Sequence, residues 1–565
     1  MPIQPDTRIT RRSLLTATAG ATAGWLIRPR GVLAAEYDLD GGPASASARQ
    51  ASTYYAPRPA SEAKLGINAD PTIPELEALK TAGVDYVRMG PGWEVVEDFE
   101  TGVLSISKKT SEAFDFMAKN DMHPVPVAAY GPPYDDVATL KVAADVPAGS
   151  LTIPLTAPPK LKILLDYVVL KLVRAQHKDQ YITNPFYSYY GSLIASTEGS
   201  TITLGAKTAV ALSAGEELKV YRLRYAPIPD LDPNGTSVRA YMRYARFVAE
   251  QIVAHGATGY VCLWNEYPWP MDKWPNLYGF YEHKTRPANL VEDKGMAAIL
   301  LAALQAPHLP PGVNWINGAS DKTGLNSIIN QFKETSVLTA AKVDGWREGM
   351  HCYSARGPEG EAWTVSGDEV TLVNQRADRE GDFGWIERFD LRSGFDIRPI
   401  ATECGAPNVE DPVKQARHHL RRTASLWGMG IVPFPGGAFT AGSPAYLALQ
   451  NLTALRNSLG SGGDSAMCPS VASVADNEWP IMSVALYGEN GAVLLVWQRT
   501  WTLEKPSEPG GGWAGIPSPP PATVTLTLGT AENIVSIQNP RTEESLPSEL
   551  TVLVADDPIA VRVMA

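Results

Sequence analysis

Residues 64–89 read KLGINADPTIPELEALKTAGVDYVRM, and this stretch sets the pattern for most of the chain. The apolar run at residues 65–68 predicts a strand. Ile73, Leu76 and Leu79 then keep helical spacing, with a proline in the first turn, where proline is tolerated. Gly83 ends this helix, and residues 84–89 predict the next strand. A strand, a helix and a strand in succession favour a parallel α/β fold.

The same alternation recurs along the chain. One apolar helical stripe ends at Gly256 and consists of Val238, Tyr241, Met242, Ala245, Val248, Ala249 and Ile252. The six further predicted strands lie at residues 123–129, 260–264, 314–317, 349–353, 397–402 and 430–434. Eight strands with intervening helices over about 390 residues favour a (β/α)8 TIM barrel with a large insertion.

Two segments break this alternation. Between residues 143 and 223 the helical period vanishes, and short β-like runs alternate with Gly, Ser and Pro, which predicts a small all-β module after strand three. Strand-like runs without helices also fill the end of the chain, which predicts a β-sandwich. The predicted domains are a signal peptide at 1–34, a linker or extended arm at 35–60, a barrel at 61–142 and 224–465, the inserted module at 143–223 and the C-terminal β-sandwich at 466–565.

The first 34 residues resemble a bacterial twin-arginine export signal. Arg11-Arg12 precede a weakly hydrophobic run rich in Ala, Gly and Thr, and Val32-Leu33-Ala34 fits a small-residue cleavage site. The alternative is an N-terminal membrane anchor, but the run at residues 13–27 is shorter than the roughly 20 residues of a spanning helix. We expect cleavage near Ala34/Ala35, a periplasmic or secreted protein, and no stable membrane insertion.

Composition excludes several functional classes. The 565 residues include 49 Lys+Arg and 61 Asp+Glu, a formal net charge of −12, so the basic footprint of nucleic-acid binding is missing. Four cysteines cannot form a dense disulfide framework. The common zinc, phosphate-loop and serine-hydrolase motifs are absent, so we expect neither a metal nor an organic cofactor. The sequence does not predict the oligomeric state.

Other residues with potential chemistry have simpler interpretations. We interpret His418 and His419 as part of a solvated face on an Arg-rich helix rather than a metal site. Cys262, Cys352 and Cys404 fall on inner strands, where we expect them to pack as small hydrophobic side chains.

Two carboxylates stand at the ends of predicted strands. Glu266 follows the fourth strand in Leu263-Trp-Asn-Glu-Tyr-Pro268, and Glu403 ends the seventh in Pro399-Ile-Ala-Thr-Glu-Cys-Gly405. Barrel enzymes place catalytic residues at these C-terminal ends, and strands four and seven face each other across the mouth. Two opposed carboxyl groups are what glycoside hydrolysis requires.

These motifs resemble the clan A retaining glycoside hydrolases, whose signature is Asn-Glu at strand four with Glu at strand seven. The similarity to families 39 and 5 adds three motifs: Thr402-Glu-Cys-Gly405, Arg88 followed by Trp93-Glu-Val-Val-Glu97, and His351-Cys-Tyr353. It covers residues 64–460 without the insertion, and the C-terminal sandwich suits family 39 best. One departure is Phe434, in a segment where the clan usually has a tryptophan after strand eight.

The resemblance implies a role for each matching residue. Glu266 is the expected general acid/base, Glu403 the nucleophile, and Asn265 the partner of the sugar 2-hydroxyl. Arg88 is expected to keep Glu403 ionised, Tyr353 to orient it, and His351 to bind substrate. The aromatic side chains expected near the sugar are Trp93, Tyr130, Trp264, Tyr267, Trp269 and Trp274.

The sequence therefore predicts an exported retaining glycoside hydrolase acting on a β-linked oligo- or polysaccharide. The two catalytic carboxyls are expected about 5–5.5 Å apart. Two alternatives stay open: a transglycosylase that uses the same residues, and a non-catalytic carbohydrate-binding protein.

Overall fold

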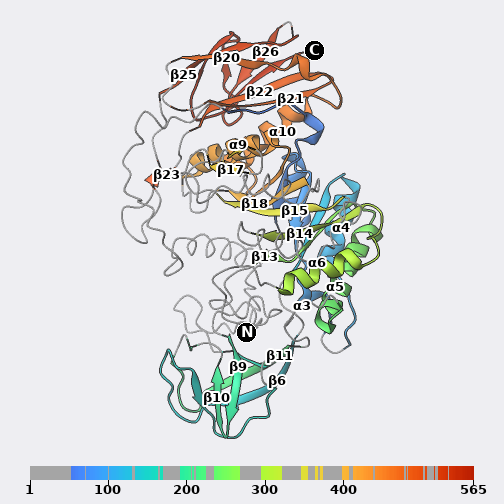
Figure 1. The fold of residues 1–565 in the computed structure, drawn as a ribbon, viewed down its shortest axis with the longest axis vertical. Helices are drawn as coiled ribbons and strands as arrows, with labels where there is room; N and C mark the ends of the chain where they lie inside the picture. The colour runs from blue at the N-terminus through green and yellow to red at the C-terminus, as the bar shows by residue number, and fades with distance from the viewer. Residues whose placement is uncertain are drawn as a thin grey trace, which may run out of the picture. The chain divides into compact units, whose positions relative to one another are not determined.

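The computed structural model has an α/β fold with several sheets (Figure 1). It describes residues 53–69, 71–98, 101–129, 134–162, 166–169, 191–204, 207–208, 211–223, 234–267, 294–320, 345–353, 363–366, 369–372, 398–405, 411–436, 440–475, 479, 481–499, 503–504, 514–515, 520–531 and 533–564. Within these ranges no helix is long and apolar enough to span a membrane.

The chain divides into two compact units, each of which is described by itself. The first unit is drawn from Met1–Met89, Ala113–Val125 and Arg347–Ala565. The second is drawn from Gly90–Glu112 and Pro126–Trp346.

The first unit opens with the βαβ element that the sequence predicts. Strands β3 (Gly66–Asn68) and β4 (Tyr86–Met89) pair in parallel, and helix α2 (Ile73–Thr81) connects them. Thr72 and Glu75 form a reciprocal capping box at the start of α2, which satisfies amide groups that the first helical turn leaves free. Leu76 and Leu79 are buried, as the helical spacing requires.

Three later parallel strands of this unit lie in chain order. They are β15 (Arg347–Tyr353), β18 (Arg398–Gly405) and β19 (Val432–Pro435). Strand β3 lies against β19, where a Cβ atom on Gly66 would be 2.5 Å from the Phe434 ring. The first and the last parallel strands are therefore neighbours.

Two helices cover these strands and pack against each other. Helix α9 (Pro412–Gly428) contacts β18 and β19, and α10 (Pro444–Asn457) lies beside α9 (Figure 1). Asp411 caps α9 and Ser443 caps α10, because each side chain accepts hydrogen bonds from amides of the first turn.

The second unit continues the α/β pattern. Strands β5 (His123–Ala128), β12 (Gly259–Leu263) and β14 (Val313–Ser320) are parallel neighbours in chain order. Helix α5 (Thr236–Ala254) packs on β12 and β14 and lies beside α6 (Lys294–Gln305). All residues of its predicted apolar stripe are buried. The chain also forms helices α3 (Trp93–Val96) and α4 (Lys108–Lys119).

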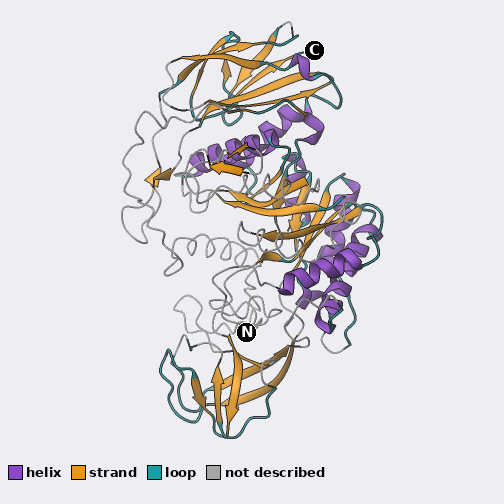
Figure 2. Cartoon of the chain, in the orientation of Figure 1, coloured by secondary structure: helices purple, strands orange, loops and turns teal. Residues whose placement is uncertain are grey.

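A six-stranded antiparallel sheet interrupts the second unit between β5 and α5. Figure 2 draws its strands in orange. Its order is β6-β11-β8-β9-β10-β7, and it has an apolar core of its own around Ile153, Ile202 and Val220. The strands are β6 (Tyr134–Lys141), β7 (Thr152–Pro154), β8 (Asp166–Val169), β9 (Gly191–Glu198), β10 (Thr201–Leu204) and β11 (Glu217–Leu223). The sheet starts at Tyr134, earlier than the expected boundary at residue 143, because β6 pairs with β11 along its whole length.

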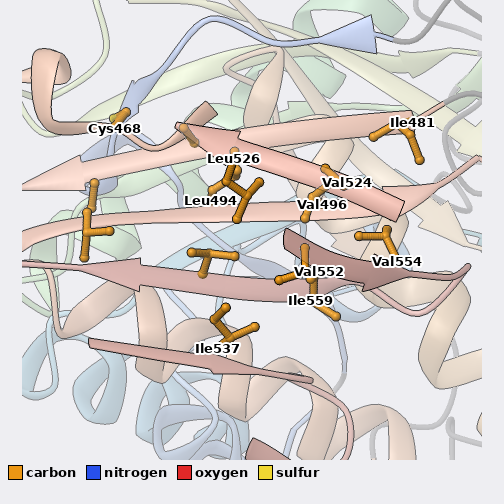
Figure 3. Close-up of a cluster of buried hydrophobic side chains, with 14 of the residues drawn as sticks. Cys468, Ile481, Leu494, Val496, Val524, Leu526, Ile537, Val552, Val554 and Ile559 are labelled. Carbon is orange, nitrogen blue, oxygen red and sulfur yellow. The ribbon is translucent and has the colours of Figure 1, made fainter. Parts of the chain in front are cut away.

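Two sheets at the end of the chain bury one shared apolar cluster (Figure 3). The first has β21 (Ile481–Gly488), β22 (Gly491–Gln498), β29 (Ile559–Val563), β26 (Ile534–Gln538) and β27 (Ser545–Leu546). The second has β20 (Ser470–Ala475), β25 (Ala522–Thr527) and β28 (Thr551–Val554). Leu494 and Val496 of the first sheet meet Val524 and Val552 of the second in this cluster. Small pairs elsewhere are β16 (Trp363–Ser366) with β17 (Glu369–Leu372) and β23 (Leu503–Glu504) with β24 (Ala514–Gly515).

The described part of the expected linker is an arm that joins a sheet. Strands β1 (Thr53–Tyr54) and β2 (Arg58–Pro59) pair in parallel with β21. The Arg58 side chain also donates to the carbonyl of Gly428 at the end of α9. Residues 53–59 therefore form an extended arm rather than a free linker, because their backbone groups pair with the edge of β21. The expected signal peptide at 1–34 lies outside the described residues.

Candidate active site

Glu403, on β18, receives a short ionic hydrogen bond from a residue on β4. The Arg88 Nη1 atom, on β4, donates to Glu403 Oε1 at 2.7 Å. Arg88 is 6% exposed, while the Glu403 side chain is 16% exposed. A buried guanidinium at this distance stabilises the ionised form of a carboxyl group, while the exposure leaves Glu403 open to a reactant.

His351 lies beside the same carboxylate. It is the register partner of Glu403 in the parallel β15–β18 ladder. Its Nε2 atom lies 3.4 Å from Glu403 Oε1, and its side chain is buried. Three residues named from the sequence, Arg88, His351 and Glu403, are thus brought together from three strands.

Asn68 completes this group, and the sequence analysis missed it. Its Oδ1 accepts a 2.9 Å hydrogen bond from Arg88 Nη1. Its Nδ2 donates to the Thr402 carbonyl oxygen at 2.9 Å and to the Phe434 carbonyl oxygen at 3.4 Å. The available signal was its position: a polar amide at the C-terminal end of the first strand, at the same sheet edge as Arg88 and Glu403.

Cys404 adjoins Glu403 but is not a nucleophile. Burial raises the pKa of its thiol to about 12; Arg422 lowers the pKa and Glu403 raises it. The thiolate, the reactive form, is therefore scarce near neutral pH. Cys262 is also buried and free of any disulfide, so both residues pack as predicted. The side chain of Cys352 lies outside the described residues.

Asn265 and Glu266 follow β12 after one residue, Trp264. They lie in β13 (Asn265–Tyr267), which pairs with β14 and contains a shift in register between Asn265 and Tyr267. Asn265 is buried. The backbone of Glu266 is described but its side chain is not, so the separation of the two carboxyl groups stays a prediction.

Trp264 turns the chain between β12 and β13. It has a φ of +70°, a left-handed conformation that side chains with a Cβ atom adopt at a cost. The Trp264 amide donates to the Ala128 carbonyl oxygen at 3.1 Å, and the Trp264 carbonyl oxygen accepts a hydrogen bond from the Cys262 thiol at 3.3 Å. The bend is therefore held from β5 and from β12, immediately before Asn265.

Tyr241 supports this bend from helix α5. Its hydroxyl donates to the same Ala128 carbonyl oxygen at 2.6 Å, and its ring centroid lies 5.7 Å from that of Trp264. Burial raises the pKa of Tyr241 well above its ordinary value, so the group stays a hydrogen-bond donor at all ordinary pH values.

The expectation that Trp93 and Trp264 present faces to a sugar is wrong for this structure. Both side chains are fully buried. The Trp93 ring stacks on Tyr244 with centroids 5.6 Å apart, and its Nε1 donates to Glu97 at 2.8 Å. The position of these tryptophans near strand ends does not indicate whether their side chains are buried. The aromatic side chains that cover both rings come from another element, helix α5.

Phe434 likewise offers no open face. It is fully buried on β19, with its ring against Gly66 of the first strand. The remaining predicted aromatic residues, Tyr130, Trp269 and Trp274, lie outside the described residues. For Tyr267 and Tyr353 the backbone is described as strand, and the side chain is not.

His418 and His419 are buried, so the expectation of a solvated face is wrong. Their helix, α9, is sandwiched between the parallel strands and β21, and Arg421 and Arg422 are buried beside them. Burial lowers the pKa of His419 to about 4, which keeps this imidazole neutral near pH 7. Among the described residues, no group of three or more His, Cys, Asp or Glu could hold a metal ion.

Solved structures with a similar arrangement include glycoside hydrolases of several families. A family 39 glycoside hydrolase from Bacteroides cellulosilyticus WH2 is 12% identical, with a TM-score of 0.46 over 90% of this chain and 83% of that chain. CelM2, a bifunctional glucanase-xylanase from a metagenome library, is 10% identical, with a TM-score of 0.43 over 92% and 100%. A GH30 endoxylanase from Clostridium papyrosolvens C71 is 8% identical, with a TM-score of 0.43 over 92% and 97%.

No family model and no curated protein matches the chain. At TM-scores this low, the likeness to solved structures assigns no activity to this chain. The function is therefore argued from the residues of the site.

Proposed function

We propose that this protein is an exported retaining glycoside hydrolase that cleaves β-glycosidic bonds of an oligo- or polysaccharide. The observation that carries the proposal is the Glu403 carboxylate, which Arg88 contacts at 2.7 Å and which is still partly exposed. A carboxylate that is ionised, fixed and accessible has the properties of a glycosidase nucleophile.

We infer that the parallel strands close into a (β/α)8 barrel. Three sets of strands follow chain order: β3–β4, β5–β12–β14 and β15–β18–β19. The contact between β3 and β19 supports closure, because an open sheet built in chain order keeps its first and last strands apart. In such a barrel Glu266 and Glu403 both follow strand ends at the catalytic face.

The proposed reaction has two displacements. Glu403 attacks the anomeric carbon, while Glu266 donates its proton to the departing glycosidic oxygen. Water then attacks the glycosyl-enzyme ester and transfers a proton to Glu266, which releases the sugar and regenerates the carboxylate of Glu403. Asn265 hydrogen-bonds the sugar 2-hydroxyl in this reaction, a contact that strengthens in the transition state.

Hydrolysis of a panel of β-linked polysaccharides and aryl β-glycosides tests the proposal. Wild type should release reducing ends, and proton NMR should detect the β-anomer of the product first. Glu403→Gln should lower turnover by about 10⁴-fold or more, because it removes a nucleophile that acts in the bond-forming step. Glu112→Gln is the matched control, since Glu112 is an exposed glutamate on α4.

The opposite outcomes assign the alternatives. Equal turnover by wild type and Glu403→Gln would remove Glu403 from the reaction. Products elongated with added acceptor sugar, at the expense of free sugar, would indicate a transglycosylase. Binding to the panel without turnover would indicate a carbohydrate-binding protein. Export is tested separately, by the cellular location of the chain with Arg11-Arg12 intact and with both replaced by lysine.

A further inference from the structure

We propose that Asn68 is a positioning residue that fixes Arg88 against the nucleophile Glu403. This inference rests on the proposed function and adds to it a residue on the first strand. It starts from the Arg88 Nη1 atom, which lies 2.9 Å from Asn68 Oδ1 and 2.7 Å from Glu403 Oε1.

Asn68 has a fixed orientation of its own. Its Nδ2 group donates to the carbonyl oxygens of Thr402 and Phe434, on β18 and β19. With the NH₂ group committed to two carbonyl oxygens, Oδ1 is the atom left to face Arg88. The backbone of the two last strands thereby determines which way the amide points.

The contacts form a closed circuit. The Thr402 carbonyl belongs to the peptide group that joins Thr402 to Glu403, so it moves with the backbone of the nucleophile. From this carbonyl the circuit runs through Asn68 to Arg88, and from Arg88 back to the Glu403 carboxylate. The parallel β3–β4 ladder also pairs Asn68 with Arg88, and the amide of Ala69 donates to the Arg88 carbonyl oxygen.

The circuit reduces the freedom of a flexible side chain. An arginine has many rotamers, and holding a charged donor in one geometry costs conformational entropy. A second acceptor, fixed to the strand that bears Glu403, limits Nη1 to the position that meets the carboxylate. A misplacement of about 1 Å at such a site can cost about 100-fold in rate.

Helix α9 and strand β15, which pack against β18, also carry ionisable side chains. These are Arg347, Glu348, His351, Cys352 and Tyr353 on β15, and Lys414, Arg417, His418, His419, Arg421 and Arg422 on α9. The described residues of β3 and β19 carry no ionisable side chain. Substitution of Asn68 changes none of these groups, so a shift in the pH–rate profile would report the Arg88–Glu403 contact.

The pH dependence of kcat/KM tests the proposal in two variants. Asn68→Ala removes the acceptor and both donors, so we expect kcat/KM to fall about 10- to 100-fold. We expect the acid limb of the profile to move about 1 pH unit upward, because a loosened Arg88 stabilises the carboxylate less. Asn68→Asp keeps the shape but adds an anion that competes for Arg88, and its acid limb should move at least as far.

Tyr446→Phe is the matched control for a purely structural role. The Tyr446 hydroxyl donates to the Ala78 carbonyl oxygen, so this variant also loses one side-chain to backbone bond between distant segments. It should lose stability without any shift of the acid limb. An acid limb at the wild-type pH in both Asn68 variants would overturn the inference, whatever their stability.

A crystal structure of Asn68→Ala separates this inference from the proposed function. Displacement of Arg88 Nη1 from Glu403 supports the positioning role even if wild type hydrolyses no substrate of the panel. An unchanged contact of about 2.7 Å, as in the wild type, would overturn it even if the hydrolase is established.

Discussion

Arg88 and Glu403 are separated by 315 residues in the chain, yet Arg88 Nη1 donates to Glu403 Oε1 at 2.7 Å. The pair joins the second strand of the predicted barrel to the seventh. The guanidinium is buried and the carboxylate is partly exposed. Arg88 therefore balances the negative charge of Glu403 from inside the protein, while the exposed part of the carboxylate remains accessible to a reactant.

The first prediction concerns the geometry of this pair. Arg88→Lys keeps the positive charge but loses the planar guanidinium, whose Nη1 atom donates to both Asn68 and Glu403. We expect kcat to fall about 100-fold with KM changed by less than about 3-fold, because the contact supports the nucleophile in the transition state. Steady-state kinetics on the best substrate of the panel measures this.

Arg243→Lys is the control for that experiment. Arg243 also pairs with a buried glutamate, Glu97, at 3.0 Å, but it lies on α5 and half of its side chain is exposed. It should retain wild-type kcat. Equal losses of kcat in both variants would show that the effect is common to arginine–glutamate pairs and is not specific to Arg88 and Glu403.

The second prediction separates backbone strain from packing at Trp264. Trp264→Ala should cost about 3–5 kcal/mol of unfolding free energy, because a fully buried indole is replaced by a cavity. Trp264→Gly leaves a similar cavity, but glycine adopts a φ of +70° without strain. The Gly variant should therefore be about 1 kcal/mol more stable than the Ala variant in urea unfolding. The reverse order would show that the left-handed conformation is not strained.

The third prediction follows from the buried His419. Its pKa falls from 6.5 to about 4 on folding, so between these values the unfolded chain binds more protons than the folded one. Burial of neutral His419 therefore costs no stability above pH 6.5, and the free energy of unfolding falls as the pH drops from 6.5 toward 4. The loss amounts to about 3 kcal/mol at most. As the pH falls from 6.5 to 4, the unfolding free energy measured in urea should decrease less for His419→Gln than for wild type.

His308→Gln is the matched control for His419, because His308 is exposed. It should keep the pH dependence of the wild type. If His419→Gln kept it as well, another group would be responsible for the loss of stability in acid.

The fourth prediction concerns an ionic group that ties α9 to the C-terminal sheets. Asp557 accepts hydrogen bonds from Arg417 at 3.0 Å and from Arg541 at 2.6 Å. Burial by itself raises the pKa of Asp557, but the hydrogen bond from Arg541 and the charges of both arginines outweigh it and hold the pKa below its ordinary 3.8. The stabilisation is thus present above pH 3.8 and is lost as the pH falls through the folded-state value.

Asp557→Asn should lower the unfolding free energy near pH 7 by about 2 kcal/mol, because two arginines lose a charged acceptor. Urea unfolding near pH 7 measures the loss. Glu112→Gln breaks an exposed pair with Lys108 and should change stability by less than about 0.5 kcal/mol. Equal effects of the two substitutions would contradict a role for the buried group.

The parallel strands could be predicted because local pattern and strand position agree. Each predicted strand coincides with an observed one, from β3 through β19, because apolar runs bounded by glycine form buried strands whatever their neighbours. Glu403 was found for a related reason: residues at strand ends of parallel sheets converge on one edge. Arg88 and His351 were named from the resemblance to clan A glycoside hydrolases. Strand β6 was missed, since Tyr134–Lys141 mixes polar and apolar residues and depends on a partner distant in sequence.

The sequence by itself determined the order of strands and helices and the residues that stand at the strand ends. Only the tertiary structure decided which side chains are covered. Trp93 and Trp264 are buried because Tyr241 and Tyr244 of α5 lie on them, and His419 is buried because α9 lies between the parallel strands and β21. It also decided the role of Asn68, whose partners Thr402 and Phe434 are 334 and 366 residues away. Burial and hydrogen bonding of this kind depend on contacts between distant segments, and the pattern of neighbouring residues carries no record of them.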